Sequence, residues 1–358
     1  MAKITLENLR HSYYPNPARD EDFALKRVAL DWEDGGAYAL LGPSGCGKTT
    51  LLNLISGLLI PTEGRILFDD KDVSRASPEQ RNIAQVFQFP VIYDTMTVYD
   101  NLAFPLRNRG VAEPEIDKRV KDIAEMLDLT KTLKNRASGL TADGKQKISL
   151  GRGLVRSDVN VIMFDEPLTV IDPHLKWQLR SKLKELHQRI RRTMIYVTHD
   201  QTEALTFADQ VVVMNNGEVV QTGTPIALFE QPRHTFVGHF IGSPGMNVLP
   251  CEVKGGKASF AGQMIETGNA AQSQGTAAKL EIGVRPEFVS LVKSGIPADV
   301  VKVTDAGRYR IVETRAGGQS VKLLVLEGDA VPQGRVNLAF DAAHTQVYED
   351  GWMAGTKS

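Results

Sequence analysis

The feature that most constrains the fold is the glycine-rich segment GPSGCGKT at residues 42–49. It matches the pattern GxxxxGK[ST], follows the short apolar run Ala37 to Leu41, and leads into the helix-like segment Thr49 to Ser56. Such a turn between a strand and a helix lets backbone N–H groups surround phosphate oxygens, with the positive end of the helix dipole behind them. The order strand, glycine loop, helix therefore predicts an α/β fold with a nucleotide phosphate site.

Two residues of this segment have separate expected roles. Lys48 is expected to reach the β and γ phosphates, and Thr49 to ligate Mg²⁺. The other residues expected to bind the nucleotide here are Gly42, Ser44, Gly45, Cys46, Gly47 and Thr50. The alternative is a glycine-rich turn without a ligand, which the flanking strand and helix disfavour.

A second apolar strand, Val161 to Phe164, ends in two adjacent carboxylates. Asp165 is expected to hold the magnesium ion, and Glu166 to orient or deprotonate the attacking water. Acidic residues before Pro167 are also compatible with a helix N-terminus, but that interpretation leaves two carboxylates at a buried strand end unexplained. The sequence therefore favours a catalytic pair.

The seven histidines differ in their surroundings. His199 directly follows the strand Ile195 to Thr198, at the sheet edge where open α/β folds place their ligands, so it is expected to contact the γ-phosphate. The other six carry no local signal and are expected at the surface or in loops: His11, His174, His187, His234, His239 and His344.

The alternation of strands and helices stops near Gly238. After Pro250 come short β-like runs separated by Gly, Pro and Asn, a pattern typical of small antiparallel barrels. The stretch His234 to Cys251 has no Asp, Glu, Lys or Arg but holds three glycines, two prolines and two histidines, so a linker is expected rather than a membrane span. The sequence predicts two domains, residues 1–237 and 238–358.

Composition excludes some function classes. The 42 basic and 43 acidic residues leave a net charge of −1, so no strongly basic field indicates a nucleic-acid partner. Only two cysteines occur, Cys46 and Cys251, which is typical of a reducing compartment. The first residues lack the pattern of an export signal. A cytoplasmic protein is therefore expected.

These residues, in this order, resemble the ATPase subunits of ABC transporters. The resemblance is carried by the motifs above together with Tyr13, Gln88 after AQVF, the segment Leu140 to Leu154, Asp172 in TVID, and His199 followed by Asp200. It implies that ATP and Mg²⁺ are bound. It also implies that Tyr13 stacks on adenine, that Gln88 senses the metal and the attacking water beside Thr49 and Asp165, and that His199 is the switch histidine.

The resemblance also implies an architecture. It comprises a RecA-like P-loop ATPase core with an antiparallel β subdomain and a helical subdomain at about residues 90–157, followed by a C-terminal β-rich, OB-like regulatory and dimerisation domain. The tail segments IGSPGMN at 241–247 and GVRPE at 283–287 look like that domain in importers of the maltose and glycerol-3-phosphate type. OB-folds also bind oligonucleotides, but the tail lacks a basic groove with interleaved aromatics.

The family implies a membrane assembly. Two ATPase subunits close face to face, each ATP lying between one phosphate loop and the partner's LSGGQ signature, and closure moves two transmembrane permease subunits. A periplasmic solute-binding protein is an indirect partner. The chain is thus expected as a peripheral protein on the cytoplasmic face of the bacterial inner membrane. The segment Gln88 to Asn101 resembles the groove that receives a permease coupling helix, although its aromatics equally fit core packing.

The signature departs from the family pattern. Aligned on Leu140 and on LGRGL at 150–154, LSGGQ is replaced by LTADG, and a helix is expected from Gln146 to Val155. The residues offered to the partner's nucleotide are Thr141, Ala142, Asp143 and Gly144. A carboxylate about 5 Å from one phosphate charge costs about 3 kcal/mol at an effective dielectric of 20, roughly a hundredfold in affinity or rate.

The residues that serve this chain's own ATP are intact, whereas the signature it offers is altered. We therefore expect a second, unlike ATPase as partner, the alternative being a homodimer that tolerates Asp143. The overall sequence resembles the second ATPase of bacterial glycerol importers, which favours glycerol as solute, with glycerol-3-phosphate or a sugar as alternatives. A function of another class, a soluble ATP-dependent regulatory protein, is left open by the sequence.

Overall fold

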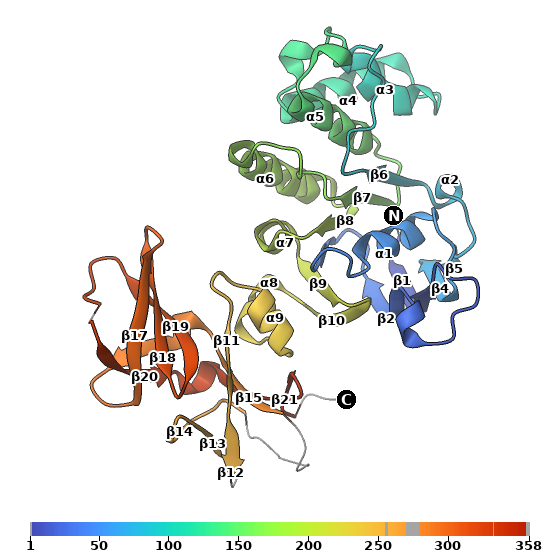
Figure 1. Cartoon of the computed structure of the whole chain (residues 1–358). Helices are drawn as coiled ribbons and strands as arrows, with labels where there is room; N and C mark the ends of the chain where they lie inside the picture. Colours follow the sequence, from blue (N-terminus) through green and yellow to red (C-terminus); the bar gives the residue numbers. More distant parts are fainter. Residues whose placement is uncertain (1, 255–256, 270–278, 332, 356–358) are drawn as a thin grey trace. The chain divides into compact units, whose positions relative to one another are not determined.

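The computed structural model describes residues 2–254, 257–269, 279–331 and 333–355. Its contacts divide the chain into two compact units, Met1–Pro225 and Ile226–Ser358 (Figure 1). No helix in the described ranges is long and apolar enough to cross a membrane.

The first unit is organised around a six-stranded sheet in the order β10-β9-β3-β8-β7-β6. The strands are β3 (Ala37–Leu41), β6 (Ile83–Val86), β7 (Val161–Asp165), β8 (Thr193–Thr198), β9 (Gln210–Asn215) and β10 (Glu218–Gly223). All pair in parallel except β10, which runs antiparallel to β9 at one edge. Every residue of β3 and β8 is buried, as expected for parallel strands covered on both faces. The carboxyl ends of β3, β6, β7 and β8 therefore meet at one sheet edge.

A second, antiparallel sheet has the order β2-β1-β4-β5. Its strands are β1 (Ile4–His11), β2 (Leu25–Trp32), β4 (Glu63–Phe68) and β5 (Lys71–Asp72). Helix α1 (Lys48–Ser56) shares one hydrophobic core with strands of both sheets: Leu51 and Leu54 belong to the same buried cluster as Trp32 and Val197. Because the helix is buried on more than one side, the apolar residues that follow the phosphate loop form no simple amphipathic stripe.

Arg81 caps the end of α1 from inside the core. It lies in the short helix α2 (Pro78–Arg81) and is 1% exposed. Its guanidinium donates hydrogen bonds to the carbonyls of Leu54 at 2.6 Å and Ile55 at 2.8 Å, in the last turn of α1, and to Ser74 at 3.1 Å. Burial lowers the pKa of Arg81 to about 10, so it remains charged at neutral pH. A buried cation thus satisfies helix-end carbonyls that lack intrahelical partners.

The remaining helices of this unit are α3 (Val98–Arg107), α4 (Glu113–Met126), α5 (Ala142–Leu154), α6 (Pro173–Ile190) and α7 (Gln201–Phe207). Helices α3, α4 and α5 contact one another and form a separate helical cluster, drawn in green in Figure 1. Helix α5 begins at Ala142, earlier than the predicted start at Gln146, because Thr141 acts as its N-cap and accepts a hydrogen bond from the N–H of Gly144. The altered signature therefore forms the first turn of α5.

The described strands of the second unit are paired antiparallel throughout. The unit begins with α8 (Pro225–Glu230) and α9 (Thr235–Phe240). Its sheets are β11 (Asn247–Pro250), β15 (Leu280–Val284), β21 (Thr345–Glu349) and β22 (Trp352–Met353); β12 (Glu252–Lys254), β13 (Lys257–Phe260) and β14 (Gln263–Ile265); and β16 (Val289–Val292), β20 (Arg335–Phe340), β17 (Ile296–Asp305), β18 (Tyr309–Ala316) and β19 (Gln319–Leu326). The tail is β-rich, as the sequence predicts; its OB-like topology stays a prediction.

The stretch His234 to Cys251 is not the linker that its composition suggests, because α9 and β11 lie within it. The buried side chain of Arg285 donates hydrogen bonds to the carbonyls of Phe229, Gly238 and Ile241. These bonds attach both short helices to the second unit. The two units accordingly divide at residue 225, earlier than the predicted boundary between residues 237 and 238.

Two histidines expected at the surface are buried, so that prediction is wrong for them. His11 is 6% exposed at the end of β1, and His187 is 5% exposed on α6, where its Nε2 lies 3.0 Å from the carbonyl oxygen of Gly35. Burial lowers the pKa of both side chains. Both are therefore part of the packed core rather than titrating surface groups.

Replacing Arg81 tests the capping of α1. Arg81→Met should lower the free energy of unfolding by about 3 kcal/mol, because several buried carbonyls lose a charged donor. Chemical denaturation of the full chain measures this, with Arg75→Met, at an exposed position of the same segment, as the control. Equal stability of both variants would contradict the capping role.

Candidate functional site

The phosphate loop adopts a backbone that requires glycine. Gly45 and Gly47 have φ values of +80° and +101°, in the left-handed region. A Cβ on Gly42 would lie 2.3 Å from the carbonyl oxygen of Met214. Gly47 precedes α1 without a side-chain cap, so the first N–H groups of the helix are left for a ligand. The loop thus has the geometry of an anion-binding turn.

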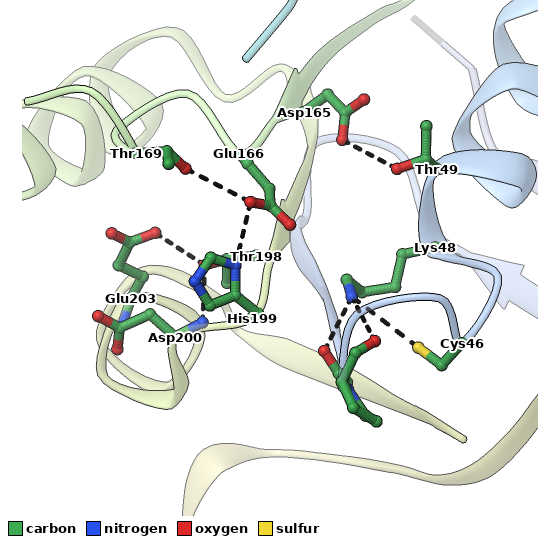
Figure 2. A network of polar contacts seen from close by, with 12 residues as sticks. Cys46, Lys48, Thr49, Asp165, Glu166, Thr169, Thr198, His199, Asp200 and Glu203 are labelled. Carbon is green, nitrogen blue, oxygen red and sulfur yellow. Dashed lines mark hydrogen bonds and ion pairs between the residues drawn. The ribbon is translucent and has the colours of Figure 1, made fainter. Parts of the chain in front are cut away.

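Lys48 points into this loop (Figure 2). Its ammonium group donates hydrogen bonds to the carbonyls of Gly42 at 2.8 Å and Pro43 at 3.0 Å. The same nitrogen lies 3.9 Å from Sγ of Cys46. Cys46 is buried, and burial raises the pKa of its thiol. The loop backbone therefore holds a buried cation in place, which suits the binding of phosphate oxygens.

Thr49 and Asp165 meet beside the loop. The hydroxyl of Thr49, in the first turn of α1, donates to Oδ1 of Asp165, at the end of β7, over 3.4 Å (Figure 2). Burial raises the pKa of Asp165, and the neighbouring charge of Glu166 adds to the effect. A divalent cation would relieve this repulsion, and carboxylate and hydroxyl oxygens are ligands that Mg²⁺ accepts. The described residues contain no cluster of three metal-ligating side chains, so such an ion would take further ligands from water and phosphate.

Glu166 has an unusual backbone. Its φ is +46°, in the left-handed region that non-glycine residues rarely adopt. Its N–H donates to the carbonyl of Val197 at 2.9 Å, which ties the end of β7 to β8. Strained backbone of this kind is maintained only where the surroundings hold it, and it is common at active sites. The turn directs the carboxylate toward the residue after β8.

That residue is His199. Its Nδ1–H donates to Oε2 of Glu166 at 3.0 Å, and the Thr169 hydroxyl donates to the same oxygen over 3.4 Å (Figure 2). The other carboxylate oxygen, Oε1, receives no hydrogen bond from the described residues. The carboxylate of Glu166 thus has one oxygen fixed by hydrogen bonds, Oε2, and one oxygen available to accept a proton, Oε1, which suits a general base.

Other predicted residues lie around this centre. The hydroxyl of Tyr13 is 3.1 Å from that of Thr50 in α1, and its ring is 63% exposed with an edge-on contact to His11. Gln88 follows β6, the neighbour of β7 in the sheet. It is partly buried and, within the part of the chain described, forms no hydrogen bond with Asp165. The structure therefore places Tyr13 next to the phosphate-loop helix and Gln88 at the same sheet edge as the carboxylates.

The signature residues form no hydrogen bond or ion pair with the phosphate loop among the described residues. Asp143 lies in the first turn of α5, where its Oδ2 is 3.4 Å from the ammonium of Lys147. Its Oδ1 is buried, and no described group donates a hydrogen bond to it. Asp172 is the N-cap of α6 and accepts a hydrogen bond from the N–H of His174 at 2.9 Å. The chain therefore leaves its signature outside its own nucleotide site.

Several polar residues behind His199 are not among the residues that the sequence analysis assigns to the site. Glu203, Tyr196 and Lys176 come from three different elements and meet only in the fold. A weak signal was available: Glu203 lies four residues after His199 and is followed directly by the apolar pair Ala204 and Leu205. Gln146 is also fully buried and donates hydrogen bonds to the carbonyls of Phe87 and Pro167.

Residues 25–169 match the family model described as ABC transporter. The sn-glycerol-3-phosphate import ATP-binding protein UgpC of Psychromonas ingrahamii is 39% identical over 293 residues, covering 82% of this chain and 76% of that protein. UgpC of Jannaschia sp. is 35% identical over 351 residues, covering 98% of each chain. UgpC of Rhodopseudomonas palustris is 41% identical over 291 residues, covering 81% and 75%.

Among solved structures, the chain is similar to cbiO1 from Clostridium perfringens, described as part of the ABC transporter complex cbiONQ. The two share 28% sequence identity with a TM-score of 0.57, and the match covers 64% of this chain and 90% of the other. The match in three dimensions thus agrees with the match in sequence.

Glu166→Gln tests the proposed base. The change preserves the shape of the side chain but removes its ability to take a proton, so ATP hydrolysis should fall by roughly 10²- to 10⁴-fold while ATP binding is kept. Nucleotide titration and phosphate release measure the two properties, with Glu185→Gln on the exposed side of α6 as the control. Hydrolysis that persists in Glu166→Gln would mean that the base is another residue.

Proposed function

The chain belongs to the ABC transporter family, as an ATP-binding subunit of the carbohydrate-importer type, and from this premise we propose that it energises the uptake of a small polyol or sugar. It is an ATPase that uses ATP with Mg²⁺. The observation that carries the proposed chemistry is the contact between His199 and Glu166 beside the phosphate loop. Glycerol is the favoured solute, with glycerol-3-phosphate or a sugar as alternatives.

Each residue of the centre has a distinct task in hydrolysis. The loop N–H groups and Lys48 bind the phosphates. Thr49, Gln88 and Asp165 would hold Mg²⁺, which when bound would supply positive charge to offset the charge that develops on the phosphate oxygens. Glu166 takes a proton from the attacking water at Oε1, because His199 occupies Oε2 and fixes the carboxylate plane. Oε1 is the proton acceptor because His199 and Thr169 already bond to Oε2.

The partner of this ATPase, we propose, is a second and unlike ATPase. Helix N-termini attract anions, and in the family the first turn of this helix approaches the partner's ATP. In this chain the first turn already carries an anion, Asp143. Lys147 lies within 3.4 Å and offsets part of its charge, but a side chain still stands where the family has glycine. A partner with an ordinary signature would complete the site of this chain, whereas the partner's own ATP would meet Asp143.

The surface from Gln88 to Asn101 is proposed to contact the two permease subunits at the cytoplasmic face of the bacterial inner membrane. Phe89 is 68% exposed and Val91 54%, which favours a docking role over core packing for these two side chains. Val91 also lines a cleft of about 330 Å³, together with Phe87, Phe104, Arg109, Arg152 and Arg156 among others. An apolar rim with basic residues suits a short amphipathic helix.

Purification with permeases tests the unlike pair. If this chain is expressed with its permease subunits alone, the complex should hydrolyse ATP at well under a tenth of the rate reached when a second ATPase with an intact LSGGQ is added. Asp143→Gly should raise the rate of the single-ATPase complex by roughly tenfold to a hundredfold, because it removes the charge near phosphate.

Asp122→Asn, at an exposed position of α4, is the matched control for the loss of one negative charge. Full activity of the wild-type chain without a second ATPase would contradict the pairing and favour a homodimer.

The docking surface has its own test. Phe89→Ser should reduce co-purification with the permease subunits at least about fivefold, because it removes an exposed apolar contact, while ATP binding by the isolated chain stays unchanged. Ile60→Ser, at a residue 57% exposed elsewhere on the same unit, should have no effect. Equal recovery of permeases with both variants would exclude Phe89 from the interface.

A further inference from the structure

A buried carboxylate lies directly behind His199. Glu203, on α7, is 4% exposed. Its Oε2 accepts hydrogen bonds from the hydroxyls of Thr198 at 2.8 Å and Tyr196 at 3.2 Å, both on β8, and its Oε1 is 3.8 Å from the ammonium of Lys176 on α6. Burying a carboxylate is unfavourable unless it is paired and hydrogen-bonded, so this arrangement fixes three elements at one point.

Hydrogen bonds hold the backbone on both sides of His199. The hydroxyl of Thr198 accepts the N–H of Asp200 at 3.0 Å while donating to Glu203. The carboxylate of Asp200 in turn accepts the N–H of Thr202 at 2.7 Å and that of Glu203 at 3.3 Å. The residues before and after His199 are therefore both bound to α7 (Figure 2).

The imidazole of His199 has little other support. Its side chain is 52% exposed, so packing alone does not set its orientation, and its hydrogen bond in the described structure is the one to Glu166. The position of the ring then depends on the backbone that carries it. That backbone is held by Thr198 and Asp200, and the carboxylate of Glu203 supports it through the hydroxyl of Thr198.

We propose that Glu203 is a positioning residue for ATP hydrolysis: it holds the His199 peptide so that Nδ1–H meets Oε2 of Glu166. Glu203 does not touch the reacting atoms and takes no proton. The proposal rests on the roles proposed above for Glu166 and His199. Its first readout, the environment of the His199 ring, does not depend on those roles.

The first experiment follows the imidazole ¹⁵N signals of the full-length chain by NMR, with the His199 signal assigned from His199→Gln. Glu203→Ala should move the His199 signals toward those of a solvated imidazole, because the loop loses its anchor. Thr198→Val, which removes only the hydroxyl between Glu203 and Asp200, should move them in the same direction. Glu203→Gln keeps an acceptor for Thr198 and should restore most of the wild-type signal.

Thr193→Val is the matched control. Thr193 is fully buried at the opposite end of the same strand, where its hydroxyl donates to Asp34 at 3.2 Å and accepts the N–H of Gly35 at 3.0 Å. Its loss should reduce stability without moving the His199 signals. Unchanged His199 signals in folded Glu203→Ala and Thr198→Val, or the same shift in Thr193→Val, would overturn the proposal.

The second experiment measures kinetics in the assembled transporter. Glu203→Ala should lower kcat by about 10- to 100-fold, with the Kd for ATP changed less than about twofold, and Glu203→Gln should recover most of the rate. In a His199→Ala background, Glu203→Ala should have no further effect beyond about twofold. If the reduction of kcat in the double variant equals the product of the two single reductions, the proposal is overturned. A moved His199 signal with unchanged kcat would support the positioning and overturn the role given to His199 in hydrolysis.

Discussion

The parallel register of four strands is the constraint on which the rest of this ATPase depends. Leu41 of β3 pairs with Thr198 of β8, and Asp165 of β7 with Val197 of β8. Because the strands end together, the phosphate loop, the acidic pair and His199 leave the sheet at the same edge, although they are far apart in the sequence. Each group needs only a short turn to reach the site, which keeps the centre on rigid elements.

The charges of the chain are distributed unequally between its own nucleotide site and its signature. On its own side, the chain gathers a buried ammonium, Lys48, and two adjacent carboxylates, a charge set that Mg²⁺ and phosphates would balance. On the side offered to a partner, the positive end of helix α5 already carries the carboxylate of Asp143, and Lys147 offsets part of that negative charge. The same chain is thus prepared for nucleotide at one surface and partly neutralised at the other, which is the physical basis for proposing an unlike partner.

Much of the centre was predictable because its residues directly follow strands and belong to motifs of fixed spacing. Lys48 and Asp165 are examples, because the glycine-rich loop and the end of an apolar strand locate them without knowledge of the tertiary fold. The left-handed backbone of Glu166 was not predictable, since it depends on the hydrogen bond to Val197 across the sheet. The buried His187 and the anchoring Glu203 were missed for the same reason, because their partners come from distant segments. The stretch after His234 was mistaken for a linker because the buried Arg285 that holds it lies some fifty residues later.

We propose that one complete hydrolytic site is formed per pair of ATPases, built on the Glu166 and His199 of this chain. The most direct measurement is the stoichiometry of nucleotide trapped with vanadate in the purified transporter containing both ATPases. A single complete site predicts one trapped nucleotide per complex, lost entirely in the Glu166→Gln variant and retained when the equivalent glutamate of the partner is changed. Two trapped nucleotides per complex, or trapping that survives Glu166→Gln, would contradict it.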